Sequence, residues 1–254
     1  MDKDMKKMMT LAAALLLTVG GLTAQNSFKG VVKYEVASTG SVAIDIPAEA
    51  RQAEIKVSGN DMFTKSPIFC GGMTEAVLVQ NLKQTRCMDY SQLLNYLRSQ
   101  DFEFTYTGKG KLLLKHEYKA SDFDSVDIPD TEPGHYYYEY VAGETKTVAG
   151  QTAKKMIRHA YDDEGVDHPM TMWYSDEIGP GLNILFGGIK GMPLECTMDQ
   201  GEDRAITYTA TEIVKGKVKE ADFLLPDGYE TLEEDELETL GSELQDAIEL
   251  LQAE

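Results

Sequence analysis

The feature that most constrains this chain is an alternation of apolar and polar residues with a period of two, which recurs along most of its length. Successive side chains of an extended strand point to opposite faces, so this alternation predicts strands with one buried face. It is clear in residues 32–36, 136–140 and 206–210, and Thr207, Thr209 and Thr211 carry the polar face of the last. In residues 32–36 and 206–210 the expected inward positions are Val32, Tyr34, Val36, Ile206, Tyr208 and Ala210.

Short turn-forming segments should join these strands into hairpins. Residues 102–106 alternate, Gly108-Lys109-Gly110 can turn the chain, and residues 112–118 alternate on the way back. Further pairs are expected within residues 152–175 and 193–214. About eleven strands with such short connections predict an antiparallel sheet.

A sheet of so many strands curls, and its apolar concave face needs a cover. The candidates are a helix near residues 91–98, which carries Leu93, Leu94 and Leu97, and the segment 182–186. We therefore predict a mainly β, α+β fold: a strongly curved antiparallel half-barrel of about eleven strands around short helices, with a C-terminal helix in addition.

Residues 1–24 have the order of a secretion signal. Lysines precede an apolar run, Leu11–Leu22, and small residues surround Ala24. About a dozen apolar residues are too few to span the roughly 30 Å core of a bilayer as a helix. We expect cleavage after Ala24 and a periplasmic or secreted mature protein without a transmembrane segment, the alternative being a buried helix or retained anchor. Met5 as the true start is a further hypothesis, because Asp2 and Asp4 are unusual in such a leader.

After the leader we expect one half-barrel domain, residues 25–229, and an acidic helical tail, residues 230–254. Thr231-Leu-Glu-Glu234 has the spacing of a capping box, and Gly241 allows one kinked helix or two. A stripe of large apolar residues at helical spacing should dock on the convex back of the domain's own sheet, or alternatively on a second copy or another envelope protein. The stripe comprises Leu237, Leu240, Leu244, Ile248 and Leu251.

Charge excludes some partners. The chain has 43 acidic and 24 basic residues, a formal net charge of −19. Nucleic acid is therefore disfavoured, because its phosphates need Lys and Arg, and anionic membrane surfaces are disfavoured likewise.

The cysteines are Cys70, Cys87 and Cys196, which allow at most one intramolecular disulfide. Cys196 alternates with Leu194 and Met198, so we predict a buried free thiol there. A bond between Cys70 and Cys87 is left open.

Signatures of catalysis are absent from the sequence: it has no GxSxG, HExxH, Walker loop or complete GxGxxG. The acidic stretch 122–130 lacks the glycine and closing glutamate of an EF-hand loop, so we expect a solvated loop rather than a calcium site. The histidines should be structural. We predict no enzyme activity, no cofactor and no metal. The histidines are His116, His135, His159 and His168.

The aromatic inner face has two interpretations: it fills its own core, or it lines a cavity for an apolar ligand. The candidate ligand-lining residues are Phe104, Leu112, Tyr138, Met172 and Tyr208. The glycine-rich segment 179–192 is expected to cover the open side of the sheet as a plug or lid, the alternative being a rigid core crossing. Its candidate lid residues are Leu182, Leu185, Phe186 and Ile189.

Four sequence pieces carry a resemblance to a known group. They are Phe28–Tyr34, Lys146–Met156, Met172–Glu177 with the following Gly191–Glu195, and Ala221–Tyr229. Together they resemble secreted bacterial domains of unknown function that look related to the GLPGLI proteins and to the lipoprotein-carrier (LolA/LolB-like) half-barrel superfamily. The second piece departs from the pattern, because Ala153 stands where the family often has a cysteine. The resemblance implies a half-barrel, acyl-chain binding in the carriers, and no catalytic residue.

These observations predict a non-enzymatic exported protein that binds a lipid or other apolar molecule in a half-barrel cavity. The alternative is a structural or interaction module of the cell envelope whose core is filled by its own side chains.

Overall fold

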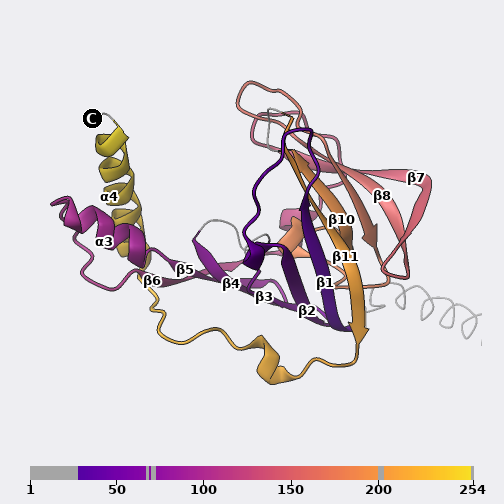
Figure 1. The fold of residues 1–254 in the computed structure, drawn as a ribbon, viewed down its shortest axis with the longest axis horizontal. Helices are drawn as coiled ribbons and strands as arrows, with labels where there is room; N and C mark the ends of the chain where they lie inside the picture. The colour runs from indigo at the N-terminus through magenta and orange to yellow at the C-terminus, as the bar shows by residue number, and fades with distance from the viewer. Residues whose placement is uncertain (1–27, 67–68, 70–72, 200–202, 253–254) are drawn as a thin grey trace, which may run out of the picture.

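A single antiparallel sheet dominates the computed structural model, which describes residues 28–66, 69, 73–199 and 203–252 (Figure 1). The sheet has eleven strands in the order β6-β5-β4-β3-β2-β1-β11-β10-β9-β8-β7, which confirms the predicted class and the predicted number of strands. The leader and Cys70 lie outside the described residues. The strands are β1 (Lys29–Ser38), β2 (Gln52–Ser58), β3 (Asp61–Thr64), β4 (Thr74–Gln80), β5 (Lys83–Asp89), β6 (Lys111–Glu117), β7 (Tyr136–Val148), β8 (Gln151–Ala160), β9 (Met170–Ser175), β10 (Met192–Asp199) and β11 (Ala205–Lys215).

Helical elements are few. α3 (Ser91–Ser99) and α4 (Glu234–Gln252) are the α-helices of the described residues. No helix there has both the length and the apolar character needed to cross a membrane. The short 3₁₀ turns are η1 (Ala48–Ala50), η2 (Ala120–Phe123), η3 (Ile184–Phe186) and η4 (Glu220–Phe223).

The alternation predicted for β1 sets the inner face of the sheet. Val32, Tyr34 and Val36 are 0%, 2% and 4% exposed. The Tyr34 hydroxyl donates a hydrogen bond of 2.8 Å to the carbonyl of Pro193. As predicted, Cys196 is a buried free thiol, and burial raises its pKa to about 11. We call the face of these side chains the inner face and the opposite one the outer face.

Two connecting segments cover the inner face. Tyr118, Phe123 and Val126, between β6 and β7, pack against the main core, and Ile184 and Ile189, between β9 and β10, are buried in it. Because β6 and β7 are opposite edges of the sheet, the first segment crosses from one edge to the other. A buried core therefore lies between the sheet and these crossings.

The prediction of a strand at residues 102–106 is wrong. The chain there is irregular, and Phe102, Phe104 and Tyr106 pack against α3 and α4. Side chains take the place of a neighbouring strand: Arg98 donates to the carbonyl of Tyr106 at 2.7 Å, and the Glu243 carboxylate accepts from the backbone N–H of Thr105 at 3.0 Å. Backbone groups satisfied in this way need no strand partner.

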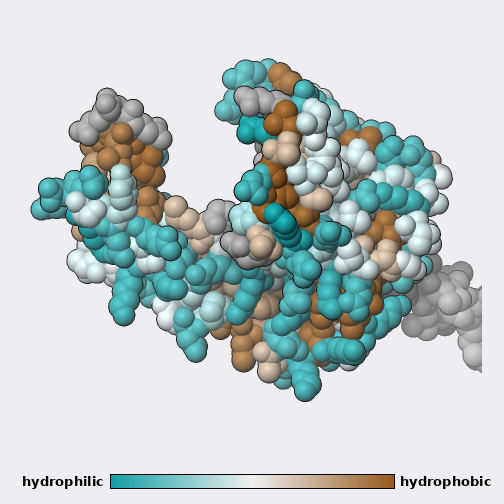
Figure 2. Space-filling view, in the orientation of Figure 1, coloured by the Kyte–Doolittle hydropathy of each residue, from teal (hydrophilic) through white to brown (hydrophobic). Residues whose placement is uncertain are grey.

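The C-terminal helix docks on its own chain, but not on the convex back as expected. The chain between β11 and α4 takes that place: Phe223 and Tyr229 pack on the outer face against Phe63 and Cys87. In Figure 1 the same segment runs below the strands β2–β6. α4 then reaches α3 at the β5–β6 end, where the two helices stand together, separated by a broad hollow from the rest of the molecule (Figure 2).

The contact between α3 and α4 is apolar. α4 is a single helix that continues through Gly241. It buries Leu240 and Leu244, while Ile248 of the predicted stripe remains 36% exposed. The predicted cap at Thr231 is also wrong. The helix begins at Glu234, and the Glu236 carboxylate accepts from the backbone N–H of Glu233 at 3.0 Å. The capping residues are thus shifted by two positions, and the bond from the Glu236 carboxylate back to the backbone is one half of a capping box.

Candidate functional site

The candidate site is a cavity of about 320 Å³ on the inner face, between strands β7–β11 and the η3 turn. We call it the inner cavity. Its volume lies at the small end of the range for ligand sites, about 300–1,000 Å³. The cavity is lined by Phe69, Tyr136, Tyr138, Arg158, Met170, Leu185, Phe186, Gly187, Met198 and Tyr208.

Strand pairing brings the floor of the inner cavity together. Arg158 of β8 lies directly across from Tyr138 of β7 and Met170 of β9. Tyr208 of β11 pairs with Cys196 of β10, two residues before Met198. Because alternate residues share a face, the period-two pattern of five neighbouring strands creates this floor.

The η3 turn forms the cover. The backbone N–H of Asn183 donates to the carbonyl of Ile189 at 2.7 Å, and the Asn183 side-chain amide donates to the carbonyl of Gly191 at 2.8 Å. These bonds fix the base of the turn, while Leu185 and Phe186 line the cavity.

Tyrosine hydroxyls link the floor to the cover. Tyr138 donates a hydrogen bond of 2.9 Å to the carbonyl of Phe186. Burial raises the pKa values of Tyr138 and Tyr208 well above the ordinary value for tyrosine, so both hydroxyls stay protonated in neutral solution. Protonated hydroxyls can donate to carbonyls or to a polar atom of a ligand, but they offer no base for catalysis.

An aromatic cluster occupies part of the space beneath the cover. The rings of Phe69 and Phe186 meet edge to face with centroids 5.6 Å apart, and Phe69 meets Tyr208 at 5.1 Å. Tyr34 also contacts Phe69, at 5.0 Å. Edge-to-face pairs at these distances are favourable, so the cluster stabilises the packing between the η3 turn and the sheet.

Arg158 is the cation of the inner cavity. Its guanidinium carbon lies 4.8 Å from the centroid of the Tyr136 ring, and its charge counteracts part of the rise that burial causes in the pKa of Tyr138. A guanidinium stacked on an aromatic face keeps donors at its edge for other partners.

The structure brings together only part of the residues proposed from the sequence. Tyr138, Tyr208, Leu185 and Phe186 line the inner cavity. Met172 and Ile189 are buried in the main core, against which Leu182 packs. Phe104 and Leu112 lie in the separate cluster with α3 and α4, so they do not line this cavity. The cavity contains residues not proposed from the sequence, namely Phe69, Tyr136, Arg158, Met170 and Met198.

One signal in the sequence could have identified Arg158. It follows the buried Met156 by two positions in β8 and therefore points to the same face. A charged residue at an inward position of a strand is uncommon and indicates a site.

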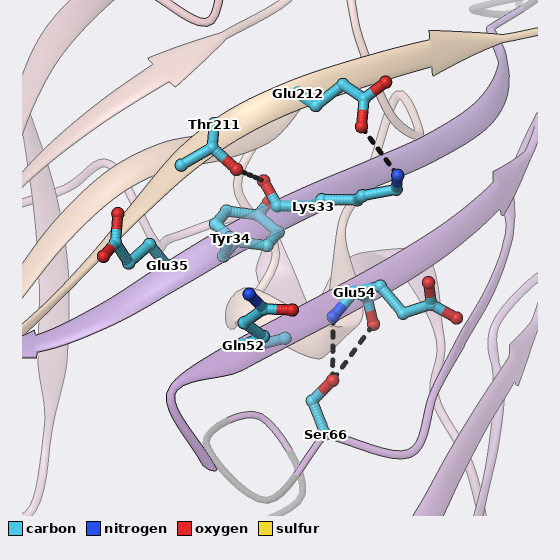
Figure 3. A pocket seen from close by; sticks show the side chains of 9 residues that line it. Lys33, Tyr34, Glu35, Gln52, Glu54, Ser66, Thr211 and Glu212 are labelled. Atoms are coloured by element: carbon cyan, nitrogen blue, oxygen red, sulfur yellow. Dashed lines mark hydrogen bonds and ion pairs between the residues drawn. The ribbon is translucent and has the colours of Figure 1, made fainter. Parts of the chain in front are cut away.

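A larger hollow of about 580 Å³ lies on the outer face, at the irregularity where β1 pairs with β11 (Figure 3). Its polar groups largely satisfy one another. Lys33 pairs with Glu212 at 2.6 Å, and the backbone N–H of Glu54 donates to the Ser66 hydroxyl at 2.8 Å. Its lining contains three glutamates and a single lysine, which is typical of a solvated face rather than of an apolar ligand site.

Three histidines at the end of the β7–β9 region pair with carboxylates. His135 lies 2.7 Å from Asp130, and this hydrogen bond raises the pKa of His135. With Glu132 these form the one grouping of possible metal ligands among the described residues, and it was not proposed from the sequence. The side chains are largely exposed and already bond to one another.

No protein-family model and no curated protein matches the chain. Among solved structures it is similar to a chain of the Pseudomonas aeruginosa MucA/MucB complex, at 10% identity and a TM-score of 0.37 over 78% of this chain and 56% of that one. It is also similar to the Mycobacterium tuberculosis lipoprotein LppX, at 13% identity and a TM-score of 0.26 over 80% of this chain and 90% of that one.

A further similar structure is a LolA superfamily protein from Nitrosomonas europaea, at 9% identity and a TM-score of 0.27 over 78% of this chain and 91% of that one. This is the superfamily that the sequence motifs resemble. The chain spans little more than half of the matched chain of the MucA/MucB complex.

Proposed function

We propose that this protein is an exported, non-enzymatic binding protein that holds one lipid or other apolar molecule in the inner cavity. The observation that carries the proposal is the lining itself: aromatic, methionine and leucine side chains from five strands and a turn converge on one hollow. Such a lining favours an apolar ligand through the removal of its surface from water. Export rests on the leader of residues 1–24.

A second candidate function is supported by the aromatic cluster. If Phe69, Phe186 and Tyr208 keep their contacts at all times, the core is filled by its own side chains. The protein is then a structural or interaction module of the envelope without a ligand.

Filling the cavity separates the two candidates. Met198 lines the inner cavity and is half-buried, so Met198→Trp should occupy the space of a ligand. The control is Leu250→Trp, at a position that is 61% exposed on α4. The protein is purified from the periplasm, and its intact mass should match a chain that begins at Gln25. An organic extract of this protein is then analysed for lipids by mass spectrometry. Dodecanol binding to the delipidated protein is measured by displacement of a fluorescent apolar probe.

We expect wild type and Leu250→Trp to bind dodecanol alike and Met198→Trp to lose at least tenfold in affinity. The lid hypothesis adds that dodecanol slows amide hydrogen exchange in residues 182–189, because a ligand beneath η3 would hold the turn closed. No lipid in the extract and no dodecanol binding would favour the self-filled module.

A further inference from the structure

Arg158 differs from the other cations of its strand in having no acidic partner among the residues that the structure describes. Lys154 pairs with Asp176 at 2.5 Å, and Lys155 pairs with Glu144 at 3.0 Å. Arg158, in contrast, forms no ion pair with a carboxylate of the described residues; its guanidinium lies over the ring of Tyr136, and it pairs with Tyr138 across β7 and β8. The chain has 43 acidic residues for 24 basic ones. The lack of a carboxylate partner at Arg158 therefore does not result from a shortage of acidic residues.

The position of Arg158 suits a charged head group. It is half-buried and lines a cavity whose other side chains are uncharged. Attraction between opposite charges is stronger at such a site than in open water. A guanidinium can donate two parallel hydrogen bonds to a carboxylate or phosphate, and stacking on Tyr136 would leave the edge of its plane available.

We infer that the ligand is a single-chain amphiphile with an anionic head, which Arg158 binds while the chain lies among Leu185, Phe186 and Met198. This inference rests on the proposed function and specifies its ligand class. The small cavity favours one acyl chain over two. A carboxylate and a phosphate share the chemistry that the guanidinium recognises, so both are included.

The competing explanation gives Arg158 a structural role, in which it holds the rings of Tyr136 and Tyr138 in place. Removing the side chain would then weaken binding of every ligand, charged or not, or would lower stability. Removing a head-group partner would weaken only the anionic ligands.

The experiment measures the affinities of dodecanol, dodecanoate and dodecyl phosphate for the delipidated full-length mature protein, with acetate and inorganic phosphate as heads without a chain. The variants are Arg158→Gln, Arg158→Lys and the control Lys154→Gln, which removes a paired cation from the same strand. Melting temperatures establish that each variant is folded.

We expect wild type and Lys154→Gln to bind dodecanoate or dodecyl phosphate at least about tenfold more tightly than dodecanol, since a hydrogen-bonded charge contributes this much or more. Arg158→Gln should bring that ratio close to one by weakening the binding of the anionic amphiphiles, and Arg158→Lys should retain part of it. The short anions should bind weakly to every form.

Equal affinities for dodecanol and the anionic amphiphiles in wild type would overturn this inference and leave the proposed function standing. Loss of dodecanol binding in a folded Arg158→Gln would assign Arg158 the structural role instead. If no amphiphile binds wild type, dodecanol included, the proposed function itself fails.

Discussion

Gly191 shows how one residue fixes the cover of the inner cavity. It lies between η3 and β10, and its φ of 93° is one that side chains of L residues rarely adopt. A Cβ built there would collide with the backbone carbonyl of Ser175. The close approach of these two backbones is what directs the covering segment back into the sheet.

Substitution of this glycine should be costly. We expect Gly191→Ala to lower the free energy of unfolding by more than about 1–3 kcal/mol, because the strain of the backbone and the collision add. Gly181 lies in the same segment without a positive φ and with no atom within 4 Å of an added Cβ. Gly181→Ala should therefore change stability by less than about 0.5 kcal/mol. Urea denaturation of both variants checks the difference, and equal stabilities would contradict it.

His159 couples stability to pH. Its burial lowers its pKa, but hydrogen bonds to Asp167, at 2.6 Å, and to Glu139, at 3.3 Å, outweigh burial, and the pKa is raised. A raised pKa means that protonation stabilises the folded state. The contribution is fully present below the unfolded pKa of about 6.5 and is lost as the pH rises through the higher folded value.

The test compares wild type with His159→Gln in urea at about pH 5.5 and about pH 8.5, on either side of the ordinary histidine pKa. We expect the difference in free energy of unfolding between the two proteins to be larger at the acidic pH. Other histidines are common to both and cancel in the comparison. A difference that is larger at the alkaline pH would show that the sign of the shift is wrong.

At the scale of elements, α4 is expected to stabilise its own chain. Leu240 is 2% exposed and packs with Leu94, Leu97 and Leu112. Leu240→Ala should lower the free energy of unfolding by about 2–5 kcal/mol, the range for deleting a buried leucine side chain. Leu250→Ala, at an exposed position of the same helix, should have almost no effect.

A truncated chain that ends at Glu230 distinguishes docking of α4 on its own chain from binding of α4 to a partner. Self-docking lowers its melting temperature and exposes the apolar face of α3. If the helix serves only a partner, the melting temperature stays unchanged and an assembly seen by light scattering is lost. Loss of assembly without loss of stability would contradict the self-docking prediction.

Elements with regular alternation were predictable from the sequence, and irregular ones were not. β1, β8, β9, β10 and β11 follow a local pattern that pleating dictates. Residues 102–106 show the same alternation, but their backbone is satisfied by Arg98 and by Glu243, which lies 138 residues from Thr105. No local pattern records a side-chain partner so far along the chain.

The candidate site was only half predictable for a related reason. Alternation tells which face a side chain occupies, but not where along the sheet its strand lies. Leu112 and Tyr138 lie on strands that follow one another in the chain and share the inner face, yet β6 and β7 are at opposite edges. Leu112 is therefore in the cluster with α3 and α4, whereas Tyr138 lines the inner cavity.

At the scale of the whole molecule, the first and last strands are neighbours at the middle of the sheet. β1 pairs with β2 on one side and with β11 on the other, and Lys33 meets Glu212 across 179 positions of the chain. During synthesis one edge of β1 therefore stays unpaired until β11 has been made. Pairings across such separations form slowly, and an unpaired edge invites other chains to add to it. Every fragment that stops before β11 carries this open edge at its centre, so the sheet has no shorter form in which β1 is paired on both sides.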